Sequence, residues 1–258
     1  MVITTTMIIV FLAGLCWGSF INVFALRTLH DEQFLLGRSK CPACQTPLLW
    51  YDNIPLLSFA LLRGRCRWCA TTISWLYPFI EFLTALLAVG LLTLTNDWQV
   101  YMAYACFIST LLAATHTDLA TMLIPRAFTL WVIPFAFLDA WMGNGLSVTL
   151  QQSIWGALLG YGILWMLAKV YYLCTRREGL GEGDMELLAM IGSCLGPLAV
   201  WVSLMVASFA GSIVGFIFML VTKKGLQSRI PFGPFLALGA LFYLFFQNWV
   251  LSFFPWIW

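Results

Sequence analysis

Long apolar runs alternate with short polar turns along the whole chain, and their lengths predict membrane-spanning helices. A helix rises about 1.5 Å per residue, so roughly 20 apolar residues cross the hydrocarbon core of a bilayer. Runs of this length, or nearly so, predict eight spans, at 5–26, 75–95, 100–115, 127–142, 150–174, 185–195, 198–222 and 234–254. We therefore expect an all-α fold, a polytopic membrane helix bundle of about eight transmembrane helices.

The composition agrees with a membrane protein. Hydrophobic residues make up 62% of the 258 residues and charged residues only 9%, which lies far outside the range of soluble globular domains. The net charge of +2 says little about partners, because 13 basic and 11 acidic residues nearly cancel. We expect the lipid bilayer as a partner and no nucleic acid.

The basic residues all lie on the inner side of the membrane if the amino terminus lies on the outer side. All 13 then fall in inner loops or at the inner ends of spans: Arg27, Arg38, Lys40, Arg63, Arg65, Arg67, Arg126, Lys169, Arg176, Arg177, Lys223, Lys224 and Arg229. Because inner loops of membrane proteins are enriched in Lys and Arg, we predict an outer amino terminus. The partition also requires the short run at 185–195 to cross the membrane.

The first inner loop, residues 27–74, holds two C-x-x-C motifs separated by 21 residues. Four thiolates in this arrangement are typical of a tetrahedral zinc site, and they leave no open position for a catalytic water. Thiols on the inner side stay reduced, which favours metal binding over a pair of disulfides. We therefore predict a structural, zinc-ribbon-like loop with the ligands Cys41, Cys44, Cys66 and Cys69.

Two aspartates, Asp118 and Asp184, each stand beside an apolar run at the predicted inner membrane face. Two carboxyl groups at one depth can approach each other if their helices pack together. Like charges in close contact do not both ionise easily, so one group keeps a proton. Such a pair can activate water and protonate a scissile carbonyl, which indicates aspartyl proteolysis.

Glycines precede the second aspartate, in the segment Gly-Leu-Gly-Glu-Gly-Asp at 179–184. Gly181 and Gly183 remove side chains beside Asp184, so an extended peptide backbone can come close and add itself as a strand. The alternative is a flexible turn in which Asp184 only caps the next helix. These residues by themselves leave both interpretations open.

These motifs together resemble the type IV prepilin peptidases, a family of GxGD-type aspartic peptidases. Residues 181–184, Gly-Glu-Gly-Asp, resemble the GxGD signature, and the paired C-x-x-C loop is similar to that of the family's long-form members. Further similar segments follow in order along the chain, at 18–23, 53–58, 62–66, 73–78 with Glu81, 118–119 with 124–125, 184–192 and 231–239.

The resemblance implies a bacterial inner-membrane enzyme that removes the basic leader of type IV prepilins or type II secretion pseudopilins. It implies cleavage after a glycine at the cytoplasmic face, with Asp118 and Asp184 as catalytic residues and Gly181, Gly183 and Glu186 in a supporting loop. It further implies N-methylation of the new amino terminus by S-adenosylmethionine. Pilus or type II secretion assembly proteins are then expected partners, and the amino terminus is periplasmic.

The same resemblance suggests a division of the chain. Residues 1–26 form the first span, residues 27–74 the cytoplasmic zinc-binding loop associated with methylation, and residues 75–258 the membrane-embedded peptidase core. Asn22 and Glu81 are candidates for binding the methyl donor, because each is a polar group within or beside an apolar run. A hydrogen bond between helices is the alternative interpretation of both.

Three positions depart from the family pattern. Glu186 stands where Lys is usual, Arg126 where Asp is common, and Leu76 where Arg is often found. Because two of these changes have opposite sign, one hypothesis is that Glu186 and Arg126 trade charge and preserve the local balance.

Other functions also remain open. A peptidase without methyltransferase activity has the same aspartate motifs. An ion-coupled transporter would use Asp118, Asp184 and Glu81 as proton carriers, although its site belongs near the membrane midplane. A scaffold whose zinc loop docks a secretion ATPase predicts that changing either aspartate to asparagine leaves function intact.

Overall fold

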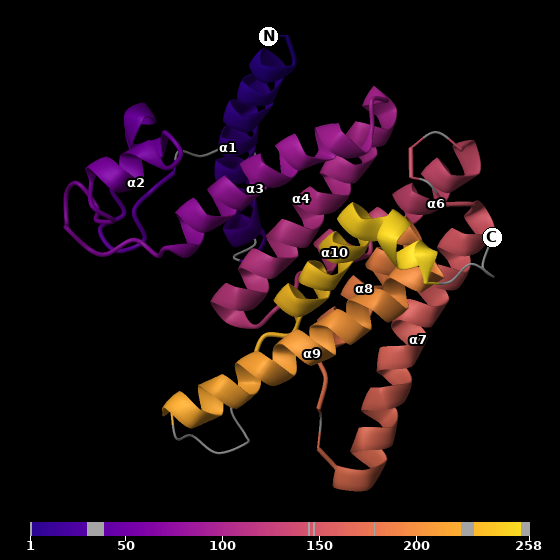
Figure 1. Ribbon diagram of the computed structural model, residues 1–258. Coiled ribbons are helices and arrows are strands. Elements are labelled where there is room, and N and C mark those ends of the chain that lie inside the picture. Colours follow the sequence, from indigo (N-terminus) through magenta and orange to yellow (C-terminus); the bar gives the residue numbers. More distant parts are fainter. Residues whose placement is uncertain are drawn as a thin grey trace. The chain divides into compact units, whose positions relative to one another are not determined.

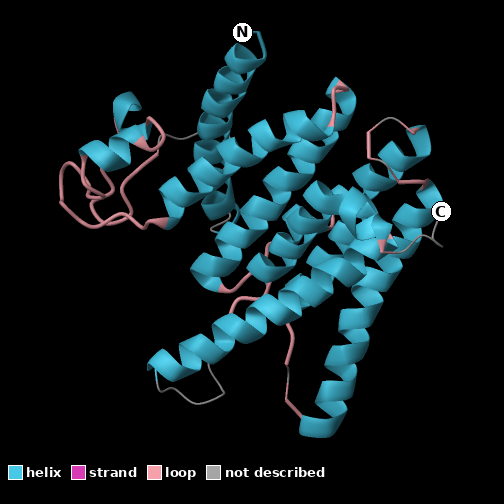
Figure 2. Ribbon diagram, in the orientation of Figure 1, coloured by secondary structure: helices cyan, strands magenta, loops and turns pink. Residues whose placement is uncertain are grey.

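The computed structural model is helical through most of the residues that it describes (Figure 1, Figure 2). These residues are 2–29, 39–143, 145–146, 148–177, 179–222 and 230–253. Among them there is no β-strand, only the isolated bridges Lys40–Pro47 and Arg65–Thr72. The predicted all-α class is confirmed.

The helices vary greatly in length. They are α1 (Val2–Leu29), the 3₁₀ turn η1 (Trp50–Asn53), α2 (Leu57–Leu61), α3 (Leu76–Leu94), α4 (Trp98–Thr121), α5 (Arg126–Thr129), α6 (Val132–Met142), α7 (Leu150–Thr175), α8 (Glu182–Leu195), α9 (Pro197–Thr222) and α10 (Gly233–Ser252). Six of them, α1, α3, α4, α7, α9 and α10, are long and apolar enough to cross a membrane.

Two of the predicted spans are shorter helices. The run at 127–142 is broken between α5 and α6, and α6 has 11 residues. Helix α8 has 14 residues, which rise about 21 Å, less than the roughly 30 Å of a hydrocarbon core. It ends at Gly196, whose φ is +86°. All α8 residues from 185 to 195 are buried, so protein surrounds this helix.

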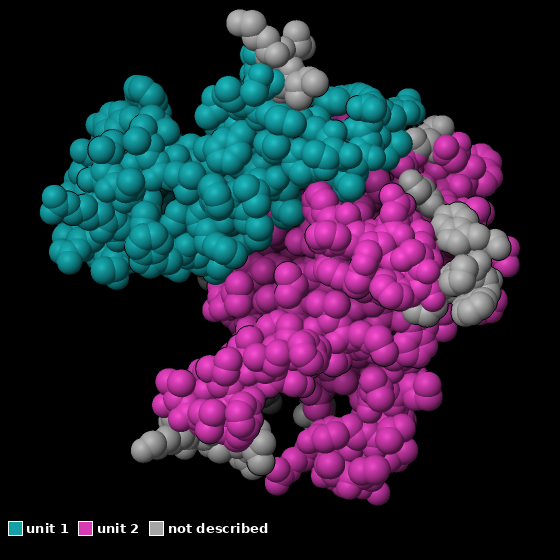
Figure 3. All heavy atoms as spheres, viewed as in Figure 1, with its two compact units in different colours: residues 1–101 teal, residues 102–258 magenta. Residues whose placement is uncertain are grey.

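The chain divides into two compact units, residues 1–101 and 102–258 (Figure 3). The first holds α1, the cysteine loop and α3. Helices α1 and α3 approach closely, because a Cβ atom at Gly18 would lie 2.7 Å from the Cα atom of Glu81. Two residues with candidate chemistry, Asn22 and Glu81, lie along this packed pair.

In the second unit, α8 contacts α5, α6, α7, α9 and α10. Its contact with α7 is the closest, since Gly156 faces Gly192 and Gly160 faces Leu188. A Cβ atom at Gly160 would lie 2.4 Å from the carbonyl oxygen of Leu188. The backbones of α7 and α8 therefore touch, and this contact fixes the position of the helix that carries Asp184.

Part of the predicted charge partition cannot be followed in the fold. The basic residues Arg38, Lys223, Lys224 and Arg229 lie outside the described residues. The orientation of the amino terminus stays a prediction.

Gly160→Ala is expected to lower thermal stability, because α7 and α8 would have to separate to admit a Cβ atom 2.4 Å from a carbonyl oxygen. Overpacking of this kind costs about 1–3 kcal/mol. Gly162→Ala on the same helix is the matched control, since its Cβ atom would meet nothing within 4 Å. Thermal unfolding of both variants in detergent gives the comparison. Equal melting temperatures would contradict the close α7–α8 packing.

Candidate active site and cysteine cluster

Asp118 lies in the last turn of α4 and is only 5% exposed. Its Oδ2 accepts a hydrogen bond from the backbone N–H of Gly233, 2.9 Å away. The helix ends soon after, because Met122 has a φ of +58° and Pro125 follows. A Cβ atom at Gly233 would lie 2.8 Å from this Oδ2. Glycine therefore lets the start of α10 reach the carboxylate.

Asp184 lies in the first turn of α8, where Gly181 is the N-cap residue. The backbone N–H of Gly181 donates to the Asp184 carboxylate, which is the interaction that the third helical residue makes in a capping box. Asp184 is therefore not the N-cap residue that the alternative interpretation of the sequence expected. Its carboxylate still supports the start of the helix.

The two carboxylates are close enough for the charge of Asp118 to act on Asp184. Ile124 holds the surrounding segments together. A Cβ atom at Gly183 would lie 2.9 Å from the Cβ of Ile124, and one at Gly233 would lie 3.1 Å from its Cδ1. The starts of α8 and α10 thus pack against the segment that follows α4. The structure brings together the two aspartates that the sequence singled out.

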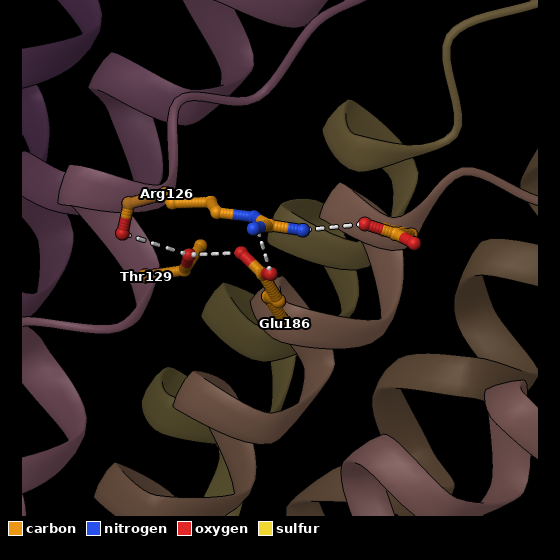
Figure 4. Close-up of polar contacts among 4 residues, drawn as sticks. Arg126, Thr129 and Glu186 are labelled. Atoms are coloured by element: carbon orange, nitrogen blue, oxygen red, sulfur yellow. Dashed lines mark hydrogen bonds and ion pairs between the residues drawn. The ribbon is translucent and has the colours of Figure 1, made fainter.

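Arg126 connects α5 to the start of α8 (Figure 4). Its Nε lies 3.1 Å from Oε1 of Glu186, and its Nη2 pairs with Oε2 of Glu182. The hydroxyl of Thr129 donates to Oε2 of Glu186 over 3.0 Å. Arg126 and Glu186, for which the sequence suggested an exchange of charge, are therefore direct partners.

The glycines of the 181–184 segment have different surroundings. A Cβ atom at Gly181 would meet only Oδ2 of Asp184, at an ordinary 3.6 Å, whereas one at Gly183 would press on Ile124. Gly181 is exposed and Gly183 is half-buried. Open space beside the Asp184 carboxylate thus lies at Gly181, while Gly183 serves helix packing.

The four cysteines of the loop form a cluster in the first unit. The sulfur atoms of Cys41, Cys44, Cys66 and Cys69 all lie within 4.8 Å of one another. The Cys41 and Cys69 sulfur atoms are 3.8 Å apart. Four Zn–S bonds of about 2.3 Å in a tetrahedron place sulfur atoms about 3.8 Å apart. The four free thiols therefore fit a tetrahedral zinc ion.

The two cysteine motifs share one backbone pattern. The N–H of Cys41 donates to the carbonyl of Thr46 over 3.0 Å, and the N–H of Cys66 donates to the carbonyl of Thr71 over 2.9 Å. The threonines also contact the sulfur atoms. Hydrogen bonding with the Thr71 hydroxyl lowers the pKa of Cys69 to about 6, which favours the thiolate that a metal requires.

Asn22 and Glu81 make contacts within the first unit. The Asn22 side-chain amide donates to the carbonyl of Tyr77 over 3.0 Å, and Oε2 of Glu81 accepts from the N–H of Leu56 over 3.0 Å. The first bond joins α1 to α3, as the alternative interpretation expected, whereas the second joins α3 to the loop at the start of α2. The buried Oδ1 of Asn22 has no hydrogen-bond partner among the described residues.

Three residues at the site were missed from sequence: Gly233, Ile124 and Thr129. Gly233 stands in Pro-Phe-Gly-Pro at the start of the last apolar run, which signals a helix start but not a contact with Asp118. Ile124 lies in the segment 124–125 that resembles the family, but its packing role arises between distant segments. Thr129 gives no signal.

Two family models match the chain. The bacterial peptidase A24 N-terminal domain matches residues 12–95, and the type IV leader peptidase family matches residues 105–220. No solved structure matches.

Curated relatives cover most of the chain. A prepilin leader peptidase/N-methyltransferase of Aeromonas salmonicida is 38% identical over 229 residues, which are 86% of this chain and 78% of the relative. One of Aeromonas hydrophila is 36% identical, over 90% of this chain and 87% of the relative. A type 4 prepilin-like proteins leader peptide-processing enzyme of Escherichia coli is 35% identical, over 91% of each chain.

Gly183→Ala is expected to reduce thermal stability, because its Cβ atom would lie 2.9 Å from the Cβ of Ile124. Gly181→Ala is the matched control two residues away, with no contact closer than 3.6 Å. We expect a melting temperature several degrees lower for the first variant, as is usual for about 1 kcal/mol of destabilisation, and little change for the second. An equal fall in the melting temperature of both variants would contradict the close packing of Gly183 on Ile124.

Proposed function

Because the chain belongs to the type IV leader peptidase family, we propose that it is a membrane aspartic endopeptidase that cleaves type IV prepilins or type II secretion pseudopilins. It is a multi-pass inner-membrane protein, as its six long apolar helices and its relatives indicate. Cleavage removes the basic leader after a glycine at the cytoplasmic face. The observation that carries the proposal is that the segments of Asp118 and Asp184 converge, since Gly233 donates to Asp118 and both Gly183 and Gly233 pack on Ile124.

The chemistry uses one proton shared by the two carboxyl groups, since like charges in mutual reach do not both ionise. The ionised carboxylate takes a proton from water as the water oxygen attacks the scissile carbonyl carbon. The protonated carboxyl group donates its proton to the carbonyl oxygen. A gem-diol forms, and no bond joins the enzyme to the substrate.

Collapse of the gem-diol restores the pair. The C–N bond breaks, and the leaving amine takes the proton that the first carboxylate had accepted from water. The second carboxylate recovers its proton from a hydroxyl group of the diol as the new carboxyl group forms. The backbone N–H groups of Gly233 and Gly181 hold the two carboxylates in place throughout.

The substrate backbone approaches beside Gly181. This glycine is exposed and leaves open space next to Oδ2 of Asp184, so an extended peptide can reach the carboxylate without meeting a side chain. The names of the relatives support this activity over the ion-transport and scaffold alternatives.

The cysteine cluster holds a structural zinc ion. The sulfur spacing of the four cysteines supports this assignment. A loop too small to fold on its own core gains its stability from such a metal. We place this loop, residues 27–74, at the cytoplasmic side with the methylating function, and the peptidase core in residues 75–258.

The second activity is N-methylation of the new amino terminus, as the names of the relatives suggest. S-adenosylmethionine would supply the methyl group. Asn22 and Glu81 are the residues that we assign to its site. The buried Oδ1 of Asn22, which has no hydrogen-bond partner in the part of the chain that the structure describes, supports this assignment. Glu81 accepts a hydrogen bond from the loop at Leu56. Pilus or type II secretion assembly proteins are the expected partners, and the amino terminus is periplasmic.

Asp118→Asn and Asp184→Asn are each expected to reduce cleavage of a prepilin-like peptide by at least about 10³-fold, because an amide neither accepts nor supplies the proton. Cleavage would be followed with purified protein in detergent. Asp97→Asn, in an exposed turn, is the control for the same chemical change and should retain full activity.

The outcomes of this assay separate the alternatives. Cleavage that survives either active-site substitution would exclude the paired-carboxylate mechanism, and no cleavage by the parent protein would favour transport or scaffolding. With S-adenosylmethionine present, a gain of about 14 Da on the product would show methylation, and cleavage without this gain would indicate a peptidase alone.

The purified protein is expected to contain one zinc ion per chain, measured by elemental analysis. Cys66→Ser should lower this ratio, since a structural site needs all four ligands. Cys16→Ser, at a cysteine of α1 outside the cluster, should leave the ratio at one. A parent protein without zinc, or a Cys66→Ser protein that keeps it fully, would contradict the assignment.

A further inference from the structure

The ion pairs of Arg126 connect the two segments that carry the aspartates. Arg126 begins α5, shortly after the helix of Asp118 has ended, and its guanidinium pairs with Glu186 and Glu182 on α8. These two glutamates are four residues apart and share one face of the helix. Asp184 stands between them in sequence. Arg126 thus links the segment that follows Asp118 to the first turn of α8, which carries Asp184 (Figure 4).

The burial of the partners decides how much this link matters. An ion pair between exposed side chains stabilises a protein little, and the pair with Glu182 is of that kind, with side chains 66% and 74% exposed. The Glu186 side chain is only 8% exposed, and a buried carboxylate without a partner is strongly unfavourable. Arg126 and the hydroxyl of Thr129 together satisfy it.

The start of α8 is also crowded with negative charge. Glu182, Asp184 and Glu186 fall within one turn and a half, and Asp118 adds its charge from α4. Among the described elements packed against α8, the other charged residues are the exposed Lys169 on α7 and Asp139 on α6, while α9 and α10 carry none. Asp139 accepts from the N–H of Leu146, after α6 has ended. Arg126 is therefore the described cation that offsets the acids around the pair.

We infer that Arg126 is a positioning residue of the peptidase, which holds the Asp184 turn against the segment after Asp118 and balances the charge of Glu182 and Glu186. This inference rests on the proposed function. It also agrees with the suggested exchange of charge between positions 126 and 186, because the two side chains are partners.

Removing the charge of Arg126 or that of Glu186 is expected to shift the pH optimum of cleavage in opposite directions. Arg126→Gln leaves Glu182 and Glu186 unbalanced, so the carboxyl pair holds its shared proton to higher pH and the optimum rises. Glu186→Gln removes a negative charge, so the optimum falls. A shift of about 0.5 to 1 pH unit is expected for each, below the effect of a charge in direct contact. In Arg126→Gln/Glu186→Gln the optimum returns to that of the parent.

Loss of the Arg126 contacts is also expected to slow turnover. Arg126→Gln should lower kcat roughly 10- to 100-fold with little change in KM, since small displacements of catalytic groups reduce the rate of the chemical step. Arg126→Lys keeps the charge and should restore most of kcat and the parental pH optimum. Lys169→Gln is the control for loss of an exposed cation from a helix packed on α8, and it should change neither value.

The variants would be compared in the same detergent assay, with melting temperatures measured to separate misfolding from altered catalysis. Single shifts of opposite sign that cancel in the double variant support the inference. Single shifts of the same sign, or a double variant no better than the worse single, overturn it while the parent still cleaves. A parent protein that does not cleave overturns the proposed function, and the role of Arg126 falls with it.

Discussion

Two carboxyl groups held within reach of each other's charge, at the ends of packed helices, are the constraint around which the second unit is built. Each has its own backbone donor, Gly233 for Asp118 and Gly181 for Asp184. Helix α8 is enclosed by five other helices and touches α7 backbone to backbone. Protein therefore surrounds a helix that is shorter than a hydrocarbon core is thick, and these contacts hold Asp184 within reach of the charge of Asp118.

The first unit is organised around its cysteine loop. Its loop has little hydrophobic core, and the four thiols of two similar motifs converge on one point. The threonine that follows each motif lowers the pKa of that motif's second cysteine, Cys44 or Cys69, by hydrogen bonding. The loop connects to the packed pair α1 and α3, where Asn22 and Glu81 meet Tyr77 and Leu56. A metal ion on the four thiols would, together with helix packing, support the region that we propose for methylation.

Much of this could be predicted from the sequence, because apolar runs and cysteine spacing are local signals. The all-α class and the cysteine cluster followed from them, and the shared depth of Asp118 and Asp184 allowed the two to meet if their helices packed together. The short α8 did not, since an apolar run looks the same whether lipid or protein surrounds it. The contact of Gly233 with Asp118 and the role of Thr129 arise between segments distant in sequence. The opposite charges at 126 and 186 were a long-range signal that the sequence did offer, and the two side chains are paired.

The central claim is that Asp118 and Asp184 work as one unit that shares a proton. Single-turnover cleavage rates of Asp118→Asn, Asp184→Asn and the double variant test it most directly. Groups that act together lose nearly all activity when either is removed. The account therefore predicts that the double variant is no slower than the slower single variant. Losses that multiply in the double variant would mean that the two aspartates act independently, and would contradict it.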